Sequence, residues 1–446
     1  MPYYLKHYFM PDFNHKRLRP VAMADGSTAM HYLGYVQNVV AGQVLAELTP
    51  LDGIPEGYAA QDETPGALPK AQDAEARDAD ASLPIPDKHG YPEQEDFAVT
   101  LEDEEKEYWD FLQNLDRLDP RFVYNNPVFP LGPNCGRDPK NPNRIIALAN
   151  GYCFYHQGLI TVKKLLNVRQ DVDFHTGNIT FVGDIVVHGD VHPGFSVTGS
   201  SILIKGRLNG GRIKARGNVV AEAGAKGSPD AVIRAGLTVR IASCERATVI
   251  TSGNLVIDGN ALHGTFYVGG SLLSKERLQG GSTHANGIVY VKEKLGNSQG
   301  APTSVALGYN ALDFLRLQEI KNMVQVQEET LDNLKKQSRK GPHFEKECAP
   351  SIELALRKLE ILERMSKAGW RKLSADSRMA ARARVIVPGT VYPGVEISIG
   401  RAYHKVIDEQ QNVFYSLYEE EIVFGSPAVI KNWSPPSPGA GENAEP

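Results

Sequence analysis

Short apolar runs rich in β-branched residues recur along the middle of the chain, and each run begins at a glycine. Seven glycines open these runs at intervals of 16 to 19 residues: Gly183, Gly199, Gly217, Gly236, Gly253, Gly270 and Gly287. Further apolar residues stand four positions before most of these glycines: Phe195, Ile213, Val232, Val249 and Phe266. Self-similarity at a short period is typical of stacked repeat proteins, whose single repeats cannot bury their own apolar face. The pattern predicts a mainly β protein with a parallel β-helix over residues 168–311.

In this interpretation each repeat supplies two short strands, separated by turns in which glycine provides positive φ or close backbone approach. We expect a right-handed helix. Gly177, Gly183 and Gly189 are six residues apart, which resembles the left-handed hexapeptide repeat common in acyltransferases. That spacing stops after Gly189, and the last four repeats step by 17 residues. A β-sandwich is the remaining alternative, but sandwich strands do not repeat their sequence this closely.

A helical period replaces the β pattern at residue 312. The first helix has apolar residues at heptad a and d positions: Leu317, Ile320, Val324, Leu331 and Leu334, with Gln327 at a polar d position. The second helix has apolar residues at spacings of three and four: Ile352, Ala355, Leu359 and Leu362. Gly341 and Pro342 break the helix between them. The pattern predicts an antiparallel coiled-coil hairpin over residues 312–375, projecting as an arm, with a helical pair lying flat on the column as the alternative.

The β repeat returns after the helices. Residues 388–400, PGTVYPGVEISIG, match residues 188–199, HGDVHPGFSVTG, with Gly389 and Gly394 opposite Gly189 and Gly194. The helical hairpin therefore interrupts the column, and we expect residues 382–426 to complete the column and cap its exposed edge.

The flanking regions have a different character. Residues 1–58 predict a small β unit, and residues 107–167 predict the remainder of an N-terminal α/β or β domain that includes a short amphipathic helix at 107–118. Residues 59–106 are rich in Ala, Asp, Glu and Pro and predict a flexible acidic linker or insertion. Residues 434–446 predict a disordered tail.

Composition narrows the class of protein. The net charge of −5 argues against a nucleic-acid partner, and the chain has no apolar stretch long enough for a membrane span. The first residues, MPYYLKHYFMPDF, lack the apolar core of a secretory signal. Four cysteines without metal-ligand spacing, Cys135, Cys153, Cys244 and Cys348, are typical of free thiols in a reducing cytoplasm.

Nothing in the sequence predicts a catalytic residue, a cofactor or a metal site. His188 and His192 are four residues apart, but strand geometry and the Pro193 turn do not bring them together as a metal pair. A hexapeptide acyltransferase needs a base histidine, for which His263 is the nearest candidate. Acidic residues in the repeats are scattered, whereas pectate-lyase-like β-helices cluster Asp to bind calcium.

Several of these segments together resemble the flagellar assembly protein A family. The resemblance rests on VDFHTGNITFVGDIVVHGDVHPGFSVTG, IKGRLNGGRIKARGNVV, LQGGSTHANGIVYVKEKLG, TSVALGYN, the heptads and TVYPGVEISIG, over roughly residues 145–425. It implies a right-handed β-helix with an inserted coiled coil, in a bacterial cytoplasmic protein linked to flagellar assembly or polar placement and without established catalytic residues. The acidic segment 59–96 and Ser243, at a weakened turn, depart from the family pattern.

Our hypothesis is a non-enzymatic scaffold that binds protein partners through the coiled coil and the N-terminal domain, with homo-oligomers among the assemblies. Two alternatives remain open at this point. One is a β-helix enzyme acting on a polysaccharide or an acyl donor, and the other is a cytoskeletal element that polymerises by end-to-end stacking.

Overall fold

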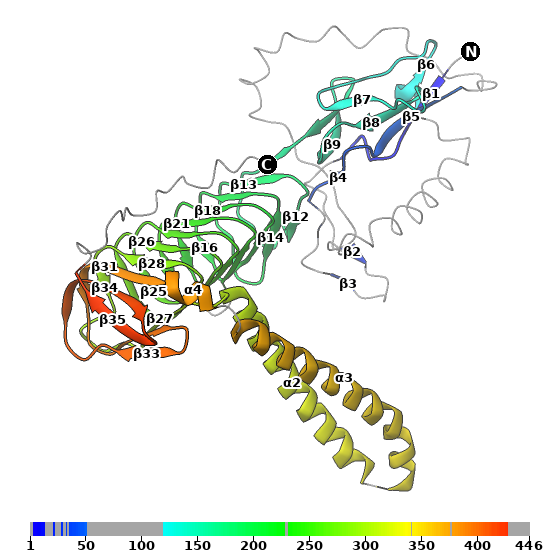
Figure 1. The fold of residues 1–446 in the computed structure, drawn as a ribbon. Coiled ribbons are helices and arrows are strands. Elements are labelled where there is room, and N and C mark those ends of the chain that lie inside the picture. The colour runs from blue at the N-terminus through cyan, green and yellow to red at the C-terminus, as the bar shows by residue number, and fades with distance from the viewer. Residues whose placement is uncertain are drawn as a thin grey trace. The chain divides into compact units, whose positions relative to one another are not determined.

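The computed structural model of the chain is shown in Figure 1. It describes residues 3–13, 21–22, 28–29, 33, 35–50, 119–227, 231–339, 341–374 and 377–426. The predicted linker 59–106, the predicted helix 107–118 and the predicted tail 434–446 lie outside the described residues. The chain divides into two compact units, which are described separately: residues 1–206 with 211–216, and residues 207–210 with 217–446.

The first unit begins with two small antiparallel sheets. The larger sheet has the order β6-β1-β5-β8-β7, with β1 (Tyr3–His7), β5 (Val44–Pro50), β6 (Val123–Tyr124), β7 (Cys135–Arg137) and β8 (Arg144–Ala147). The smaller sheet has the order β10-β9-β4, with β4 (Asn38–Val39), β9 (Gly151–His156) and β10 (Leu159–Lys163). Strands β2 (Val21–Ala22) and β3 (Thr28–Ala29) form a separate pair. Alternating apolar residues such as Ile145, Ile160 and Val162 point into the core of this region and are fully buried.

The first unit continues with parallel strands of the solenoid. These are β11 (Leu165–Val168), β12 (Ile179–Thr180), β13 (Asp184–Val187), β14 (Ser196–Gly199), β15 (Ile202–Ile204) and β17 (Arg212–Ala215). One parallel ladder joins β11, β13 and β15, and a second joins β12, β14 and β17. Asn38 covers the start of the second ladder, because its side chain accepts a hydrogen bond from Val182 N and donates one to Thr180 O, both 3.0 Å long.

The second unit contains the longer part of the solenoid. Its short strands are β16 (Leu208–Asn209), β18 (Val219–Ala221), β19 (Ala225–Lys226), β20 (Val232–Ala235), β21 (Val239–Ile241), β22 (Cys244–Glu245), β23 (Thr248–Thr251), β24 (Leu255–Ile257), β25 (Ala261–Val268), β26 (Leu272–Ser274), β27 (Arg277–Ala285), β28 (Ile288–Val291), β29 (Lys294–Leu295), β30 (Thr303–Leu307), β31 (Arg384–Val391) and β32 (Val395–Ile399). Within the described residues, the chain contains a parallel β-solenoid of about eight turns.

Three parallel ladders run through this part. The first is β18-β21-β24-β26-β28-β31, the second is β20-β23-β25-β27-β30-β32, and the third is β16-β19-β22-β25-β27-β29-β31. The prediction of two strands per repeat is therefore wrong, because a third strand is present in each turn. That strand was missed because it is only two residues long in β16, β19 and β22, too short to produce an alternating hydrophobic pattern.

In-register stacking of aliphatic side chains fills the interior. Val239, Leu255, Leu272 and Val289 occupy equivalent positions in four successive turns, and all four are fully buried. Full burial of one such side chain stabilises a fold by roughly 1.5–3 kcal/mol. Each turn thus depends on the turns on either side of it, since a single turn could not cover these groups.

The helical hairpin is inserted without interrupting the ladders. Helix α2 (Ala311–Ser338) and helix α3 (Pro342–Ser374) follow β30, and the short helix α4 (Ser377–Arg382) leads into β31. Strand β31 then pairs in parallel with β28 and β29, and β32 pairs with β30. The solenoid therefore continues after the insertion, as the sequence match between 188–199 and 388–400 predicts.

The C-terminal strands change direction. β33 (Ala402–Lys405) runs antiparallel to β32, β34 (Gln410–Tyr418) runs antiparallel to β31, and β35 (Glu421–Gly425) runs antiparallel to β34. These strands lie at the same end of the second unit in Figure 1. They occupy the edge that the last parallel turn would otherwise expose, and an uncovered edge can pair with another chain.

Candidate functional site

The predicted turn glycines serve mostly to allow close approach between successive turns. The predicted turn glycines are Gly183, Gly199, Gly217, Gly236, Gly253, Gly270, Gly287, Gly389 and Gly394. Of these nine, which all lie among the described residues, Gly394 alone has a positive φ. A Cβ on Gly389 would overlap the carbonyl oxygen of Glu293, and one on Gly183 would overlap that of Lys164.

Three of the predicted glycines form a column. Gly270 N donates to Gly253 O at 2.9 Å, and Gly287 N donates to Gly270 O at 3.0 Å. Their recurrence at intervals of 17 residues therefore reflects backbone stacking. Gly199 is the last residue of β14 and precedes the bend, so its assignment to a turn is corrected. Likewise Val232 is only half-buried, and Ile233 fills the interior position that pairs with Val249.

A row of polar side chains beside these glycines was missed by the sequence analysis. Each accepts a hydrogen bond from a backbone N–H of the following turn: Asp184 from Ser201, Asn218 from Thr238, and Asn254 from Ser271. The signal that could have revealed them is an Asp or Asn directly after the repeat glycine. Because these groups are engaged with the backbone, they hold turns in register and are not available as a catalytic set.

The hairpin residues predicted from heptad spacing are each less exposed than the residues on either side of them in the sequence. Leu317, Ile320 and Leu331 of α2 are buried, and the remaining predicted positions, Val324, Leu334, Ile352, Leu359 and Leu362, are partly buried. Gly369 allows the closest approach, because a Cβ there would overlap the Leu317 side chain. The two helices run antiparallel, since Lys372 near the end of α3 forms an ion pair of 2.9 Å with Asp313 near the start of α2.

The base of the hairpin is fastened to the solenoid by polar and aromatic contacts. Asn310 caps α2 by accepting hydrogen bonds from Leu312 N and Asp313 N. Asn286 accepts a hydrogen bond of 2.7 Å from Ala311 N, and Arg234 pairs with Glu319 at 3.1 Å. These contacts fix the first turns of α2 against strands β20 and β27.

An aromatic stack reinforces this base. The His284 ring lies parallel to Tyr267, with centroids 5.0 Å apart, and stacks on Phe314 of α2 at 4.7 Å. His284 Nδ1 and Tyr309 Oη are 2.6 Å apart. Burial lowers the pKa of His284 to about 4. The imidazole is therefore neutral near pH 7 and acts as a flat packing surface with one hydrogen bond.

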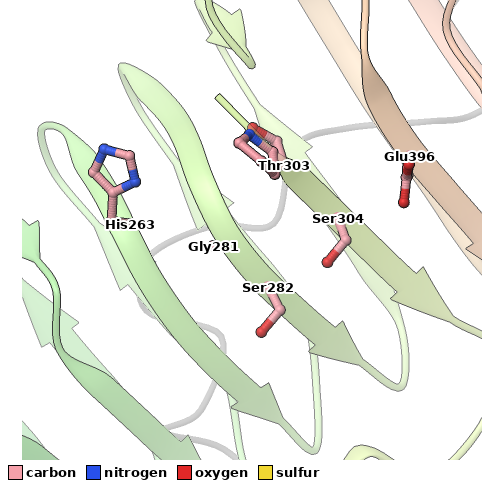
Figure 2. Close-up of a pocket in the computed structure, with 7 residues that line it drawn as sticks. His263, Gly281, Ser282, Thr303, Ser304 and Glu396 are labelled. Atoms are coloured by element: carbon pink, nitrogen blue, oxygen red, sulfur yellow. The ribbon is translucent and has the colours of Figure 1, made fainter. Parts of the chain in front are cut away.

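A hollow of about 510 Å³ lies on the side of the solenoid (Figure 2). Ser282, Ser304 and Glu396 line it from equivalent positions of successive strands, β27, β30 and β32. The Thr303 hydroxyl accepts a hydrogen bond from Gly280 N at 2.9 Å and donates to Ala301 O at 3.0 Å. His263 has a φ of 53°, in the left-handed region that non-glycine residues rarely adopt. This site had no counterpart in the sequence analysis beyond His263 itself.

The geometry of the hollow does not assemble a catalytic set. In Figure 2, His263 and Glu396 lie at opposite ends of the view, with Ser282 and Ser304 between them. Glu396 is paired with Lys405 at 3.5 Å. A nucleophilic serine needs a base within hydrogen-bond reach, and the described residues include no hydrogen bond between His263 and either serine.

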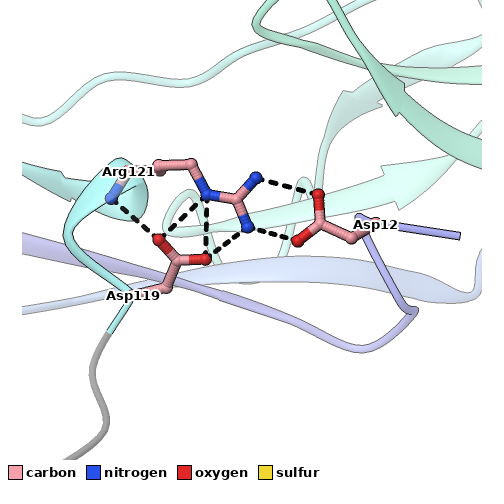
Figure 3. Close-up of polar contacts among 3 residues, drawn as sticks. All are labelled: Asp12, Asp119 and Arg121. Atoms are coloured by element: carbon pink, nitrogen blue, oxygen red, sulfur yellow. Dashed lines mark hydrogen bonds and ion pairs between the residues drawn. The ribbon is translucent and has the colours of Figure 1, made fainter.

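The N-terminal part of the first unit contains an exposed ion cluster (Figure 3). Arg121 lies between Asp12 and Asp119, donating to Asp12 Oδ1 at 2.8 Å and to Asp119 Oδ1 at 3.0 Å. The hydrogen bonds from Arg121 lower the pKa of both carboxyl groups. This cluster joins the segment after β1 to the short helix η3 (Pro120–Phe122), so it holds together two parts of the chain that are distant in sequence.

Burial favours the neutral forms of His7, Cys135 and Cys244. Burial lowers the pKa of His7 to about 3, and the ring packs on Phe122 with centroids 4.3 Å apart. All four cysteines are free and buried, and burial raises the pKa of Cys135 to about 11 and of Cys244 to about 12. Such thiols are poor nucleophiles at neutral pH because the thiolate is scarce.

The described part of the chain contains neither a metal-binding cluster nor a membrane-spanning helix. No cluster of three or more His, Cys, Asp or Glu side chains is arranged to hold a metal ion. None of the described helices combines the length and apolar character needed to cross a bilayer.

Comparison with known proteins gives one match. The family model described as the Flagellar Assembly Protein A beta solenoid domain matches residues 164–422, which is more than half of the chain. No curated protein and no solved structure matches the chain. The matched range includes the parallel strands from β11 onward, the inserted hairpin and the antiparallel strands up to β34. The chain therefore belongs to the Flagellar Assembly Protein A family, whose name indicates a role related to flagellar assembly.

Proposed function

We propose that this protein is a non-enzymatic cytoplasmic scaffold in flagellar assembly or in the polar placement of the motility machinery. It binds protein partners through the hairpin and the N-terminal sheets. The observation that carries the proposal is the solenoid of the Flagellar Assembly Protein A family with a helical hairpin that exposes several large apolar side chains. Four unpaired buried thiols are in keeping with a reducing compartment.

The shape of the parts supports a scaffold. The stacked turns form a stiff body, because every turn is held by backbone ladders and by aliphatic packing. We take the solenoid to be right-handed and the hairpin to be a coiled coil in which Gln327 supplies the polar core position. A stiff body with a projecting arm suits the spacing of partners better than the conversion of a substrate.

The alternatives receive less support. An enzyme acting on a polysaccharide or an acyl donor would require a convergent polar site, and the hollow at Ser282 and Ser304 keeps its histidine apart from both hydroxyls. A polymer built by end-to-end stacking would require open strand edges. Asn38 covers β12 in the first unit, and β33 to β35 occupy the last turn in the second.

The flagellar role is tested by gene deletion and complementation in the protein's own host. We expect the deletion to alter the number or the position of flagella, measured by electron microscopy and by swimming in soft agar. A variant in which residues 312–374 are replaced by a short Gly-Ser linker should fold, because β31 and β32 pair with strands that precede the insertion. It should nevertheless fail to complement.

A check of folding and two contradicting outcomes make this experiment decisive. The folded state of the deletion variant is checked by its far-ultraviolet circular dichroism and its melting temperature. Normal flagella and swimming in the gene deletion would contradict the flagellar role. Full complementation by the variant without the hairpin would contradict the role of the arm.

A further inference from the structure

One side of the hairpin carries uncovered apolar residues. Met323 and Val326 of α2 and Leu354, Ile361 and Met365 of α3 are between 41% and 62% exposed. We call these five residues the neutral face. A groove of about 490 Å³ crosses it, lined in part by Met323, Val326 and Ile361 from both helices. An exposed apolar patch that spans two helices is typical of an interaction surface.

Helical spacing shows that the neutral face is continuous. On α2 it follows Met323, Val326, Thr330 and Asn333, at steps of three and four residues, and on α3 it follows Leu354, Lys358, Ile361 and Met365. Lys358 is the single ionisable residue among these positions. Its stem can lie along the apolar surface while the ammonium group remains in water.

The opposite side of the hairpin is charged. Its α2 positions include Lys321, Glu328 and Asp332, and its α3 positions include Glu353, Glu360, Glu363 and Lys367. A hairpin that was solvated all round would carry charges on both sides. The contrast indicates that the neutral face is covered in the working protein and that the charged side faces water.

The whole side of the hairpin that carries the neutral face is large enough for a stable dimer. Helix α2 has 28 residues and is about 42 Å long at 1.5 Å per residue. Two helices side by side, each about 10 Å across, present roughly 800 Å² over that whole length, with the neutral face near the middle, and this is the area per partner in an interface of standard size.

We propose that the neutral face packs against the neutral face of a second copy of this chain, forming a four-helix bundle. Both helices present an apolar stripe, so a two-fold axis parallel to the hairpin places α2 of one copy on α3 of the other. Lys358 is the one ionisable residue along the stripe that contains the neutral face, so a strongly acidic or basic partner would find little electrostatic complement there. This inference deepens the proposed scaffold role, because it names the partner of the hairpin. The dimer itself does not depend on the scaffold role, but its use in the cell does.

The test measures the association of the full chain by sedimentation velocity and by light scattering after gel filtration, from micromolar to sub-millimolar concentration. We expect a reversible monomer–dimer equilibrium. Ile361→Lys places a charge in the centre of each half of the interface and should weaken the dimer on the order of 100-fold. Lys358→Leu removes the one charge and should strengthen the dimer about tenfold.

A matched control separates the interface from the fold. Leu356→Lys introduces the same charge on the same helix at a leucine of similar exposure, but on the charged side, and it should leave the dimer constant unchanged. The helical content of all three variants is compared by circular dichroism. A weaker dimer in Ile361→Lys with unchanged helical content supports the proposal, and so does a stronger dimer in Lys358→Leu.

Three outcomes would overturn it. The wild-type chain could remain monomeric at every concentration, and this outcome would count against the proposal even if the monomer bound a different protein. Ile361→Lys and Leu356→Lys could weaken the dimer equally, or Ile361→Lys could leave it intact. The swimming assay separates this proposal from the proposed function. If Ile361→Lys loses the dimer but cells carrying it have normal flagella, the interface is supported and its use in flagellar assembly is contradicted. If the wild-type chain is monomeric but the gene deletion has defective flagella, the flagellar role is supported and the dimer is contradicted.

Discussion

The solenoid and the hairpin of the second unit differ in how many of their large apolar side chains they leave exposed. Among the described solenoid residues between 217 and 310, Leu237 is the one large apolar side chain that is exposed. The hairpin exposes eight: Met323, Val326, Phe344, Leu354, Leu356, Ile361, Met365 and Trp370. The solenoid is complete within one chain, because each turn covers its neighbour. The hairpin has enough apolar surface for its own core and for a second contact.

The largest difference between the two regions is expected from truncating a leucine in each. Leu255→Ala removes a fully buried member of the aliphatic stack and should lower the free energy of unfolding by about 2–5 kcal/mol. Leu354→Ala, on the neutral face, should change the stability of the monomer by about 0.5 kcal/mol or less. Urea unfolding followed by circular dichroism, at a concentration below dimer formation, measures both. Equal losses would show that the hairpin depends on Leu354 for its own fold.

A second comparison uses glycines that have ordinary backbone φ. In Gly389→Ala the new Cβ would overlap the carbonyl of Glu293, so the turns must move apart, at a cost of about 1–3 kcal/mol. Gly341→Ala, between α2 and α3, meets nothing closer than Phe344 at 4.0 Å and should be nearly neutral. Thermal unfolding of the two variants checks the difference. A neutral Gly389→Ala would mean that the turns are not held at close-packed spacing.

The junction between the regions should respond to pH through His284. Its pKa is lowered to about 4 by burial, so the unfolded state binds a proton more readily than the folded state. Its contribution to stability is therefore complete above the ordinary pKa of about 6.5 and is lost as the pH falls from there through about 4. The protection factors of the amides of residues 311–317, which correct the exchange rates for the pH dependence of intrinsic exchange, should fall over this range, while protection at Leu255 should not. In Tyr309→Phe, which lacks the hydroxyl that lies against His284, protection of these amides should already be lower at pH 7. Protection factors that do not change with pH would show that the stack does not anchor α2.

The smallest effect is expected at the exposed ion cluster of the first unit. Arg121→Ala should cost about 1 kcal/mol or less, because the three side chains are largely in contact with water. The lowered pKa values of Asp12 and Asp119 mean that this contribution is present at neutral pH and is lost as the pH falls through those lowered values. The difference between wild type and variant should therefore vanish in acid and shrink in high salt. A loss that persists in high salt would indicate a packing role for the Arg121 stem.

Much of the fold could be predicted from the sequence because the repeats are visible in the spacing of its glycines and apolar residues. The recurrence of glycine at 17-residue steps predicts parallel stacking, and the heptads of Leu317, Ile320 and Leu331 predict the helices of the hairpin. The return of the motif at Gly389 and Gly394 predicts that the solenoid continues after the hairpin. The third ladder escaped prediction, because strands such as β19 and β22 contain two residues and leave no periodic trace.

The candidate sites were less predictable. Asp184, Asn218 and Asn254 each follow a repeat glycine, but only the structure shows which backbone N–H of the next turn each side chain binds. The stack of Tyr267, His284 and Phe314 joins residues from two strands and a helix, and nothing in their local sequence distinguishes them from surface aromatics.

The amino-acid sequence by itself determined the stacked turns, the inserted helices and the family, because periodic apolar residues and recurrent glycines are local signals that every turn repeats. Only the tertiary structure decided which glycines lie against the backbone of a neighbouring turn, which polar groups hold the turns in register, and which side of the hairpin is left uncovered. Those properties depend on contacts between residues far apart in the chain, and the burial of a side chain is set by its neighbours in space.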